Sequence, residues 1–237
     1  MKNSAESLER GAFVMENDKG IKGASVWNKL SGITVWAISF AFVEAAIVVY
    51  LRKLFHPQGF AFPLEAQLFG PILGVEVARE AATMVMLASC AWLADRRMRV
   101  RFGLLMVAFG VWDIFYYVWL WVILGWPPSP ATLDILFLIP IAWIGPVWAP
   151  CLVSVGLIGA GAAVALRVDR GNEFTLGTWG WAAELLAAFL IITSFIWLGP
   201  EVMRGEMPGA FPWPIFAAGM ALGLGGFMWA WMRSEIS

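Results

Sequence analysis

The chain is poor in the residues that build most metal and disulfide sites. Its 237 residues contain two cysteines, Cys90 and Cys151, and one histidine, His56. Two cysteines cannot form a disulfide framework or a cysteine-based zinc site, and one histidine argues against a histidine-rich iron or copper centre. No metal site is therefore predicted, and the sequence indicates no particular cofactor.

Charge is also scarce. Only 14% of the residues are charged and 60% are hydrophobic, whereas soluble domains are roughly 25% charged and about half apolar. The net charge of -1 provides no basic field that would attract nucleic acid. The mean hydropathy of +0.75 indicates a polytopic membrane protein, with the lipid bilayer as its partner and no nucleic-acid partner.

Six segments are long and apolar enough to cross a bilayer, which takes roughly 20 residues per helix. They run from about Gly32 to Leu51, Pro71 to Ala94, Phe102 to Trp126, Val147 to Leu166, Gly177 to Leu198 and Trp213 to Met232. We therefore predict an all-α polytopic transmembrane helical bundle. A polar cytoplasmic tail covers residues 1–30, and a single transmembrane helical domain covers residues 31–237.

The stretch before the fourth span is unusual because it is both apolar and rich in proline. It reads PATLDILFLIPIAWIGPVWAP and ends at Pro150. Because proline breaks helices, we predict a short helix from about Thr132 to Ile139, a break at Pro140, and then the fourth span. An interfacial helix lying on the membrane surface is the alternative.

Lysine and arginine placement predicts the orientation of the chain. Cytoplasmic loops of membrane proteins carry an excess of these residues. With the tail inside, the inner side holds Lys2, Arg10, Lys19, Lys22, Lys29, Arg96, Arg97, Arg99, Arg101, Arg167, Arg170 and Arg233, and the outer side holds Arg52, Lys53 and Arg204. We therefore expect a multi-pass protein of the cell (inner) membrane with both termini in the cytoplasm.

Glycines recur at helical spacing within two of the spans. Gly156 and Gly159 lie in the fourth span, and Gly219 and Gly223 lie in the sixth. Small residues at this spacing let membrane helices approach closely, so we predict close helix packing at these four positions. No internal repeat is evident, which weighs against an inverted-repeat transporter.

Ionisable residues within the spans mark the candidate site, because such groups are costly in lipid and face the bundle interior. Glu76, Arg79 and Glu80 share one helix face, and their depth matches that of polar residues on other segments. The predicted outward-facing site consists of Glu44, Glu76, Arg79, Glu80, Asp113, Tyr116 and Asp134. Residues 126–139 would form its lid. The structural alternative is a buried salt-bridge cluster that only holds helices together.

The charge balance of this site predicts what it holds. Glu44, Glu76, Glu80 and Asp113 would contribute four negative charges, against one positive charge on Arg79. Such an excess cannot persist away from water, so either a carboxylate carries a proton or a cation occupies the site. The proton is favoured, because the sequence shows no ligand spacing typical of a metal site.

Three functions remain open. Proton- or cation-linked transport of a small solute is the first prediction, since carboxylates lie at membrane depth. The alternative is a membrane-embedded enzyme acting on a lipid or isoprenoid substrate at the outer face, with carboxylates as acid and base. A third is a non-catalytic subunit of an oligomer or membrane complex. The chain lacks nucleotide-binding, metalloprotease and serine-hydrolase motifs, so whether it is an enzyme stays open.

Overall fold

The structure is a computed structural model that describes residues 25–57, 59–63 and 72–236. Among these residues, six helices are long and apolar enough to cross a membrane. They are α2 Val26–Phe55, α3 Leu73–Ala94, α4 Met98–Leu124, α5 Trp148–Asp169, α6 Gly177–Ile196 and α8 Trp213–Ile236, with a short α7, Gly199–Met203, after α6. The prediction of an all-α bundle is confirmed, and the six helices fit a polytopic membrane protein.

The predicted spans match these helices, and the differences lie at the helix ends. α2 contains 30 residues, which corresponds to about 45 Å of helix and exceeds a hydrocarbon core of about 30 Å. Because α2 begins at Val26, residues 26–30, which the sequence analysis assigns to the polar tail, are helical. Arg52, which the sequence analysis places beyond the first span, is helical as well. Residues 1–24 of the predicted tail lie outside the described residues.

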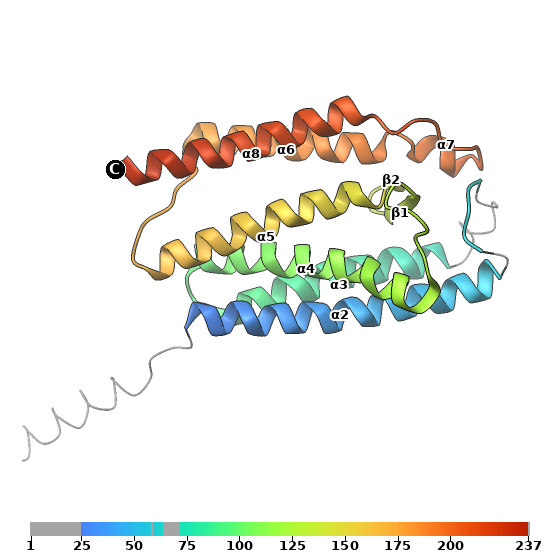
Figure 1. Cartoon of the computed structure of the whole chain (residues 1–237), viewed down its shortest axis with the longest axis horizontal. Coiled ribbons are helices and arrows are strands. Elements are labelled where there is room, and N and C mark those ends of the chain that lie inside the picture. Colours follow the sequence, from blue (N-terminus) through green and yellow to red (C-terminus); the bar gives the residue numbers. More distant parts are fainter. Residues whose placement is uncertain (1–24, 58, 64–71, 237) are drawn as a thin grey trace, which may run out of the picture.

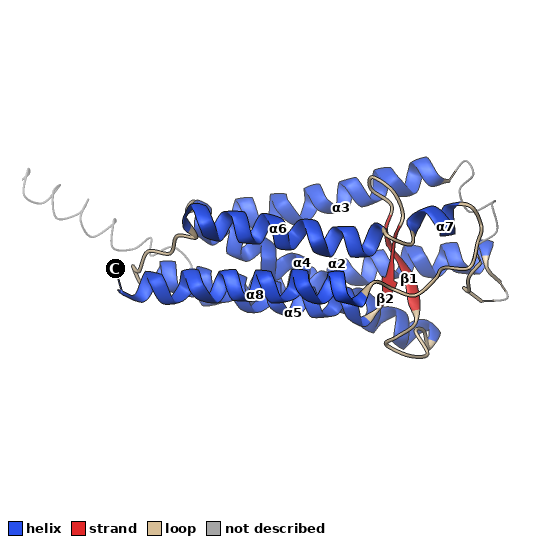
Figure 2. Cartoon of the chain, turned by 90° about the horizontal axis from the view of Figure 1, so that it is seen from above, coloured by secondary structure: helices blue, strands red, loops and turns tan. Residues whose placement is uncertain are grey.

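The helices form two groups. α4 packs along α5 and α2 and also contacts α3, whereas α6 packs mainly against α8. Figure 1 shows the α6–α8 pair on one side of α5, with α2, α3 and α4 on the other. The start of α2 and the C-terminus lie at one end, here called the terminal end. The strands and α7 lie at the opposite end (Figure 2), here called the hairpin end.

The segment between α4 and α5 is a β-hairpin, so the predicted short helix from Thr132 to Ile139 is wrong. β1 (Leu133–Phe137) pairs antiparallel with β2 (Trp143–Pro146), and Asp134 lies opposite Gly145. Flanking prolines leave too few residues for a stable helix, because proline lacks the N–H that a helix needs. Two short strands instead satisfy each other's backbone groups, which burial inside a membrane protein requires.

α4 and α5 approach closely where glycines face across their interface. A Cβ atom on Gly103 would lie 2.5 Å from the carbonyl oxygen of Gly161. One on Gly110 would lie 2.6 Å from the carbonyl oxygen of Ser154. These glycines therefore permit the backbone contact that small residues provide between membrane helices.

The four glycines predicted to mediate packing divide into two pairs. A Cβ atom on Gly219 would lie 2.8 Å from Ile191, and one on Gly223 would lie 3.3 Å from Ala187, both on α6. Close packing is confirmed at those positions. It is wrong for Gly156 and Gly159, because the nearest atom to a Cβ on Gly156 is 4.0 Å away and Gly159 has none within 4 Å. Both line a cavity instead.

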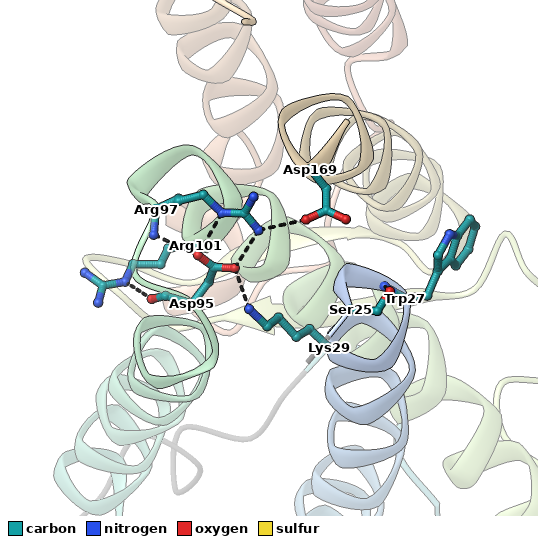
Figure 3. A network of polar contacts seen from close by, with 7 residues as sticks. All are labelled: Ser25, Trp27, Lys29, Asp95, Arg97, Arg101 and Asp169. Carbon is teal, nitrogen blue, oxygen red and sulfur yellow. Dashed lines mark hydrogen bonds and ion pairs between the residues drawn. The ribbon is translucent and has the colours of Figure 1, made fainter. Parts of the chain in front are cut away.

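An ionic cluster ties three elements together at the terminal end, as Figure 3 shows. The carboxylate of Asp95, in the turn after α3, accepts hydrogen bonds from Lys29 at 2.7 Å and from Arg97 at 3.0 Å. Arg97 also reaches Asp169 on α5 at 3.0 Å. Burial alone would raise the pKa of Asp95, but the bonds from Arg97 and Lys29 outweigh it and hold that pKa well below its usual range.

Candidate functional site

A polar cavity of about 220 Å³ lies at the hairpin end between α2, α3, α4 and β1. Every side chain predicted for a shared site lines this cavity. These are Glu44 on α2, Glu76, Arg79 and Glu80 on α3, Asp113 and Tyr116 on α4, and Asp134 on β1. The structure thus brings together all seven residues, while their use by a solute, proton or cation stays a prediction.

Arg79 and Glu44 join α3 to α2 across one wall of the cavity. The Arg79 guanidinium donates through Nη1 to Glu44 and through Nε to Glu76 at 3.0 Å. Thr83, one turn further along α3, donates its hydroxyl to the other oxygen of Glu44. Because Glu44 is only 3% exposed, Arg79 rather than water balances its charge, and the Thr83 hydroxyl supplies a further hydrogen bond.

Arg52 and Asp134 fix the hairpin against α2. Arg52 Nη2 lies 3.2 Å from Asp134 Oδ1, and the guanidinium stacks 3.7 Å from the ring centroid of Trp126. Burial raises the pKa of Asp134 to about 6, against the lowering influence of Arg52, the Ile135 amide and the Tyr117 hydroxyl. A cation–π contact of this kind strengthens when it is removed from water.

Glu80 and Asp113 complete the polar lining without forming an ion pair to any described residue. Glu80 accepts a hydrogen bond from the backbone amide of Leu138 at 2.8 Å. Asp113 accepts one from the hydroxyl of Ser154 at 2.8 Å. The cavity therefore has five carboxylates but only two guanidinium groups, Arg52 and Arg79, among its described lining residues.

The predicted lid, residues 126–139, contributes partly to this cavity. Residues 134–138, which include most of β1, line it, and the Glu80 contact with Leu138 holds the end of β1 against α3. Residues 128–133 do not line it. Whether the hairpin moves as a lid stays a prediction.

Sequence reasoning missed three cavity residues. Arg52 was counted as a loop cation, although it follows Glu44 by eight residues and continues the same helix face. Tyr117 is not among the predicted site residues either, although its ring centroid lies 5.0 Å from that of Tyr116 and it lines the cavity. Trp112 is not among the predicted site residues, yet it is buried and lines the cavity beside Asp113. Its position immediately before an intramembrane aspartate was the available signal.

A second, larger cavity separates the two helix groups. It has a volume of about 1050 Å³ and a predominantly apolar lining from α4, α5, α6 and α8. It is open at the surface of the bundle, since the lining residues Val155, Leu224 and Met228 are each more than half exposed. It extends from Phe137 and Trp143 at the hairpin end to Met98 and Thr175 at the terminal end. Glu184 of α6, an ionisable residue that is not part of the predicted site, lines this apolar chamber rather than the polar cavity.

The two cavities share a wall. Trp112 and Asp113 of α4 and Leu136 and Phe137 of β1 line both of them. Asp113 is therefore the single carboxylate common to the two described linings. A polar compartment and an apolar compartment meet at this residue.

The described residues limit the kinds of ligand that the chain could bind. Within it, no three histidine, cysteine or carboxylate side chains are grouped so that they could hold a metal ion. Both cysteines are free thiols. Comparisons with protein-family models, curated protein sequences and solved structures found no match to this chain.

Proposed function

We propose that this chain is a multi-pass transporter of the cell membrane that moves a small cationic solute in exchange for, or together with, a proton. The observation that carries the proposal is the position of Asp113 in the wall between the polar cavity and the apolar chamber. A carboxylate that faces two compartments can exchange a proton with either one. Intramembrane carboxylates commonly serve as such relays in transporters.

The charge balance supports a cationic solute. With all groups ionised, five carboxylates and two guanidinium groups leave the cavity strongly negative. Such a charge away from water requires protons or a cation as compensation. Glu80 and Asp113 have no ion-pair partner among the described residues, so a proton and a cationic solute would compete for these two carboxylates.

The chamber supports passage through the protein. Asp113 and Glu184 both line it, and its lining reaches residues near both ends of the bundle. The Glu184 Oε1 atom is buried and makes no hydrogen bond to a described residue. A second carboxylate on the route would let a cation or proton leave Asp113 toward the terminal end.

We also propose the orientation that the lysine and arginine distribution predicts. Both termini would lie in the cytoplasm, so the polar cavity would open toward the outer face. The solute would then meet Asp113 first from outside the cell.

Proteoliposomes that enclose a pH-sensitive dye test the transport proposal. Choline and tetramethylammonium are suitable probes, because their permanent charge prevents diffusion across lipid. Wild-type protein should change the luminal pH when a probe is added, and Asp113→Asn should abolish this response. Ser39→Ala is the control, since Ser39 bonds only to Val35 of its own helix turn and lines neither cavity. The absence of a response with folded wild-type protein would refute transport of this solute class.

The chamber also favours one second function, an enzyme that acts on a lipid or isoprenoid substrate. Asp113 and Tyr116 would then exchange protons with a polar group of the substrate, while the apolar chamber held its chain. Incubation of the purified protein with total membrane lipid extract, followed by mass spectrometry, would test this function. A chemically altered lipid that Asp113→Asn fails to produce would support the enzyme over the transporter.

A further inference from the structure

The apolar chamber has the size and lining of a site for an alkyl chain. Its volume of about 1050 Å³ lies just above the range of roughly 300–1,000 Å³ found for ligand pockets. Gly156 and Gly159 line it without close neighbours, so two residue positions that could carry side chains leave the space open. Packing between α5 and α8 is correspondingly sparse.

The polar cavity is the natural place for the other end of the same molecule. Its volume of about 220 Å³ accommodates only a small group. Because Trp112, Asp113, Leu136 and Phe137 line both cavities, one elongated ligand could place its polar head beside Asp113 and its chain in the chamber. The excess of carboxylates over guanidinium groups selects a cationic head.

A buried hydrogen-bond donor without a partner at the shared wall adds a second requirement for the ligand. Trp112 is 8% exposed, and its indole Nε1 atom makes no hydrogen bond to any described residue. An indole N–H can only donate, and a buried donor without a partner carries a free-energy cost of about 1–3 kcal/mol. An acceptor oxygen on the carbon next to the one that bears the cationic head would satisfy this donor.

From these contacts we infer that the cationic group of the solute carries an alkyl chain. The solute is then a single-chain amphiphile, a long-chain amino alcohol, whose head group is as small as the cations that probe transport. Its ammonium group lies among the carboxylates of the polar cavity, its hydroxyl oxygen accepts from Trp112, and its alkyl chain occupies the chamber. This inference rests on the proposed function for the direction of movement, but the binding site itself does not depend on transport.

Equilibrium binding in nanodiscs tests each part of the molecule separately. The probe is tritiated 2-aminododecan-1-ol, and empty nanodiscs measure its partition into lipid. Unlabelled 2-aminododecan-1-ol should displace the probe. 2-Aminobutan-1-ol, which lacks the chain, and dodecanoate, which has the wrong charge, should displace it poorly. Equal displacement by dodecanoate would overturn the cationic head, and equal displacement by 2-aminobutan-1-ol would overturn the chain site.

Three variants assign the parts of the ligand to residues. Asp113→Asn should weaken binding by more than about tenfold, since it removes a charged hydrogen-bond partner. Trp112→Phe should weaken binding of the amino alcohol by roughly 3- to 10-fold but leave dodecylamine, which lacks the hydroxyl, unchanged. An equal loss for both probes would mean that Trp112 only packs, and would overturn the hydroxyl assignment.

Gly156→Leu fills the chamber, because a Cβ at this position would lie 4.0 Å from Leu224 of α8. It should remove the advantage of the long chain, so that 2-aminododecan-1-ol binds no better than 2-aminobutan-1-ol. Gly225→Leu is the matched control. Gly225 has open space around it, does not line the chamber and is exposed. Equal losses in both variants would overturn the chamber assignment.

Native mass spectrometry separates the proposed solute from a resident membrane lipid. If a phospholipid remains bound to wild-type protein at saturating 2-aminododecan-1-ol and is lost in Gly156→Leu, the chamber is a lipid site and the inference fails. Binding as expected, with no luminal pH response in proteoliposomes, would refute transport but retain the ligand. A choline response without amphiphile binding would do the reverse.

Discussion

Arg79 links two helices that otherwise make limited contact. α2 and α3 pack mainly against α4 rather than against each other, and the Arg79 guanidinium bridges Glu44 and Glu76 with a side chain that is 20% exposed. Removing one partner of a buried ionic network leaves the remaining charges uncompensated. Arg79 therefore contributes to stability whichever function the cavity serves.

We expect Arg79→Ala to lower the free energy of unfolding by about 3–5 kcal/mol. Arg79→Lys should recover only part of this loss, because an ammonium group cannot bridge two carboxylates with the planar fork of a guanidinium. Thermal melts in detergent measure both effects. Arg204→Ala is the matched control, since Arg204 forms a similar fork with Glu206 on an exposed surface, where ion pairs contribute little. An unchanged melt for Arg79→Ala would contradict a buried network.

Asp134 should give the protein a pH dependence opposite to that of an ordinary ion pair. Its pKa of about 6 in the folded protein exceeds the value of about 3.9 expected in an unfolded chain. The folded state therefore binds the extra proton, so the stability from Asp134 is complete below about pH 4 and is lost as the pH rises through 6.

A comparison of wild type with Asp134→Asn tests this sign. Thermal melts between pH 4 and pH 7 should fall less steeply with rising pH in the variant, because one titrating group is gone. Asp95→Asn is a useful contrast, since the lowered pKa of Asp95 predicts a stability loss that is constant above about pH 4. The loss should shrink only below that pH, where the unfolded carboxylate takes up its proton. Parallel curves for wild type and Asp134→Asn would show that Asp134 stays ionised throughout.

At the scale of elements, the contact between α4 and α5 depends on glycine. A Cβ on Gly161 would meet the carbonyl oxygen of Gly103 and lie 2.8 Å from Met106 Cβ. Backbone atoms cannot rotate away, so the two helices would have to separate. We expect Gly161→Ala to cost about 1–3 kcal/mol of stability. Gly159→Ala, on the same helix with no atom within 4 Å, should be neutral in the same thermal melts. Equal stability of both variants would contradict the close approach.

The helices were predictable from sequence because each is a long apolar run, and length alone distinguishes a span from other structures. The depth of charged residues along those runs then sufficed to group Glu44, Arg79 and Asp113 in one layer. The hairpin was not predictable in the same way. Its strands are short apolar runs, and such runs do not separate strand from helix by periodicity.

Although a hairpin replaces the predicted short helix, all seven predicted residues still line one cavity. Asp134 lies on β1 rather than on a helix, but the segment still starts from the end of α4 and must return to the start of α5. The short connection keeps Asp134 at the same depth. The wall that the two cavities share, in contrast, could not be predicted, because it depends on the separation of α6 and α8 from α5. No pattern within a single helix indicates that separation.

At the scale of the whole molecule, basic residues gather at the terminal end. Lys29, the arginines around the α3–α4 turn and those after α5 all lie there, and Figure 1 shows these connections at the same end as the C-terminus. At the hairpin end the described cations are Arg52, Lys53 and Arg204, together with Arg79 in the wall of the polar cavity. The orientation of the bundle therefore determines toward which side of the membrane the polar cavity opens.

Cysteine labelling of intact cells measures this orientation directly. In a background with Cys90→Ala and Cys151→Ala, Pro57→Cys places a thiol at the hairpin end and Asn172→Cys places one at the terminal end, and both positions are exposed. The excess of basic residues at the terminal end predicts that this end is cytoplasmic. A membrane-impermeant maleimide should therefore label Pro57→Cys in intact cells and Asn172→Cys only after lysis. The reverse pattern would turn the polar cavity toward the cytoplasm, so that the solute would reach Asp113 from inside the cell. Labelling of both positions in intact cells would contradict an odd number of membrane crossings between them, and with it the six-span topology.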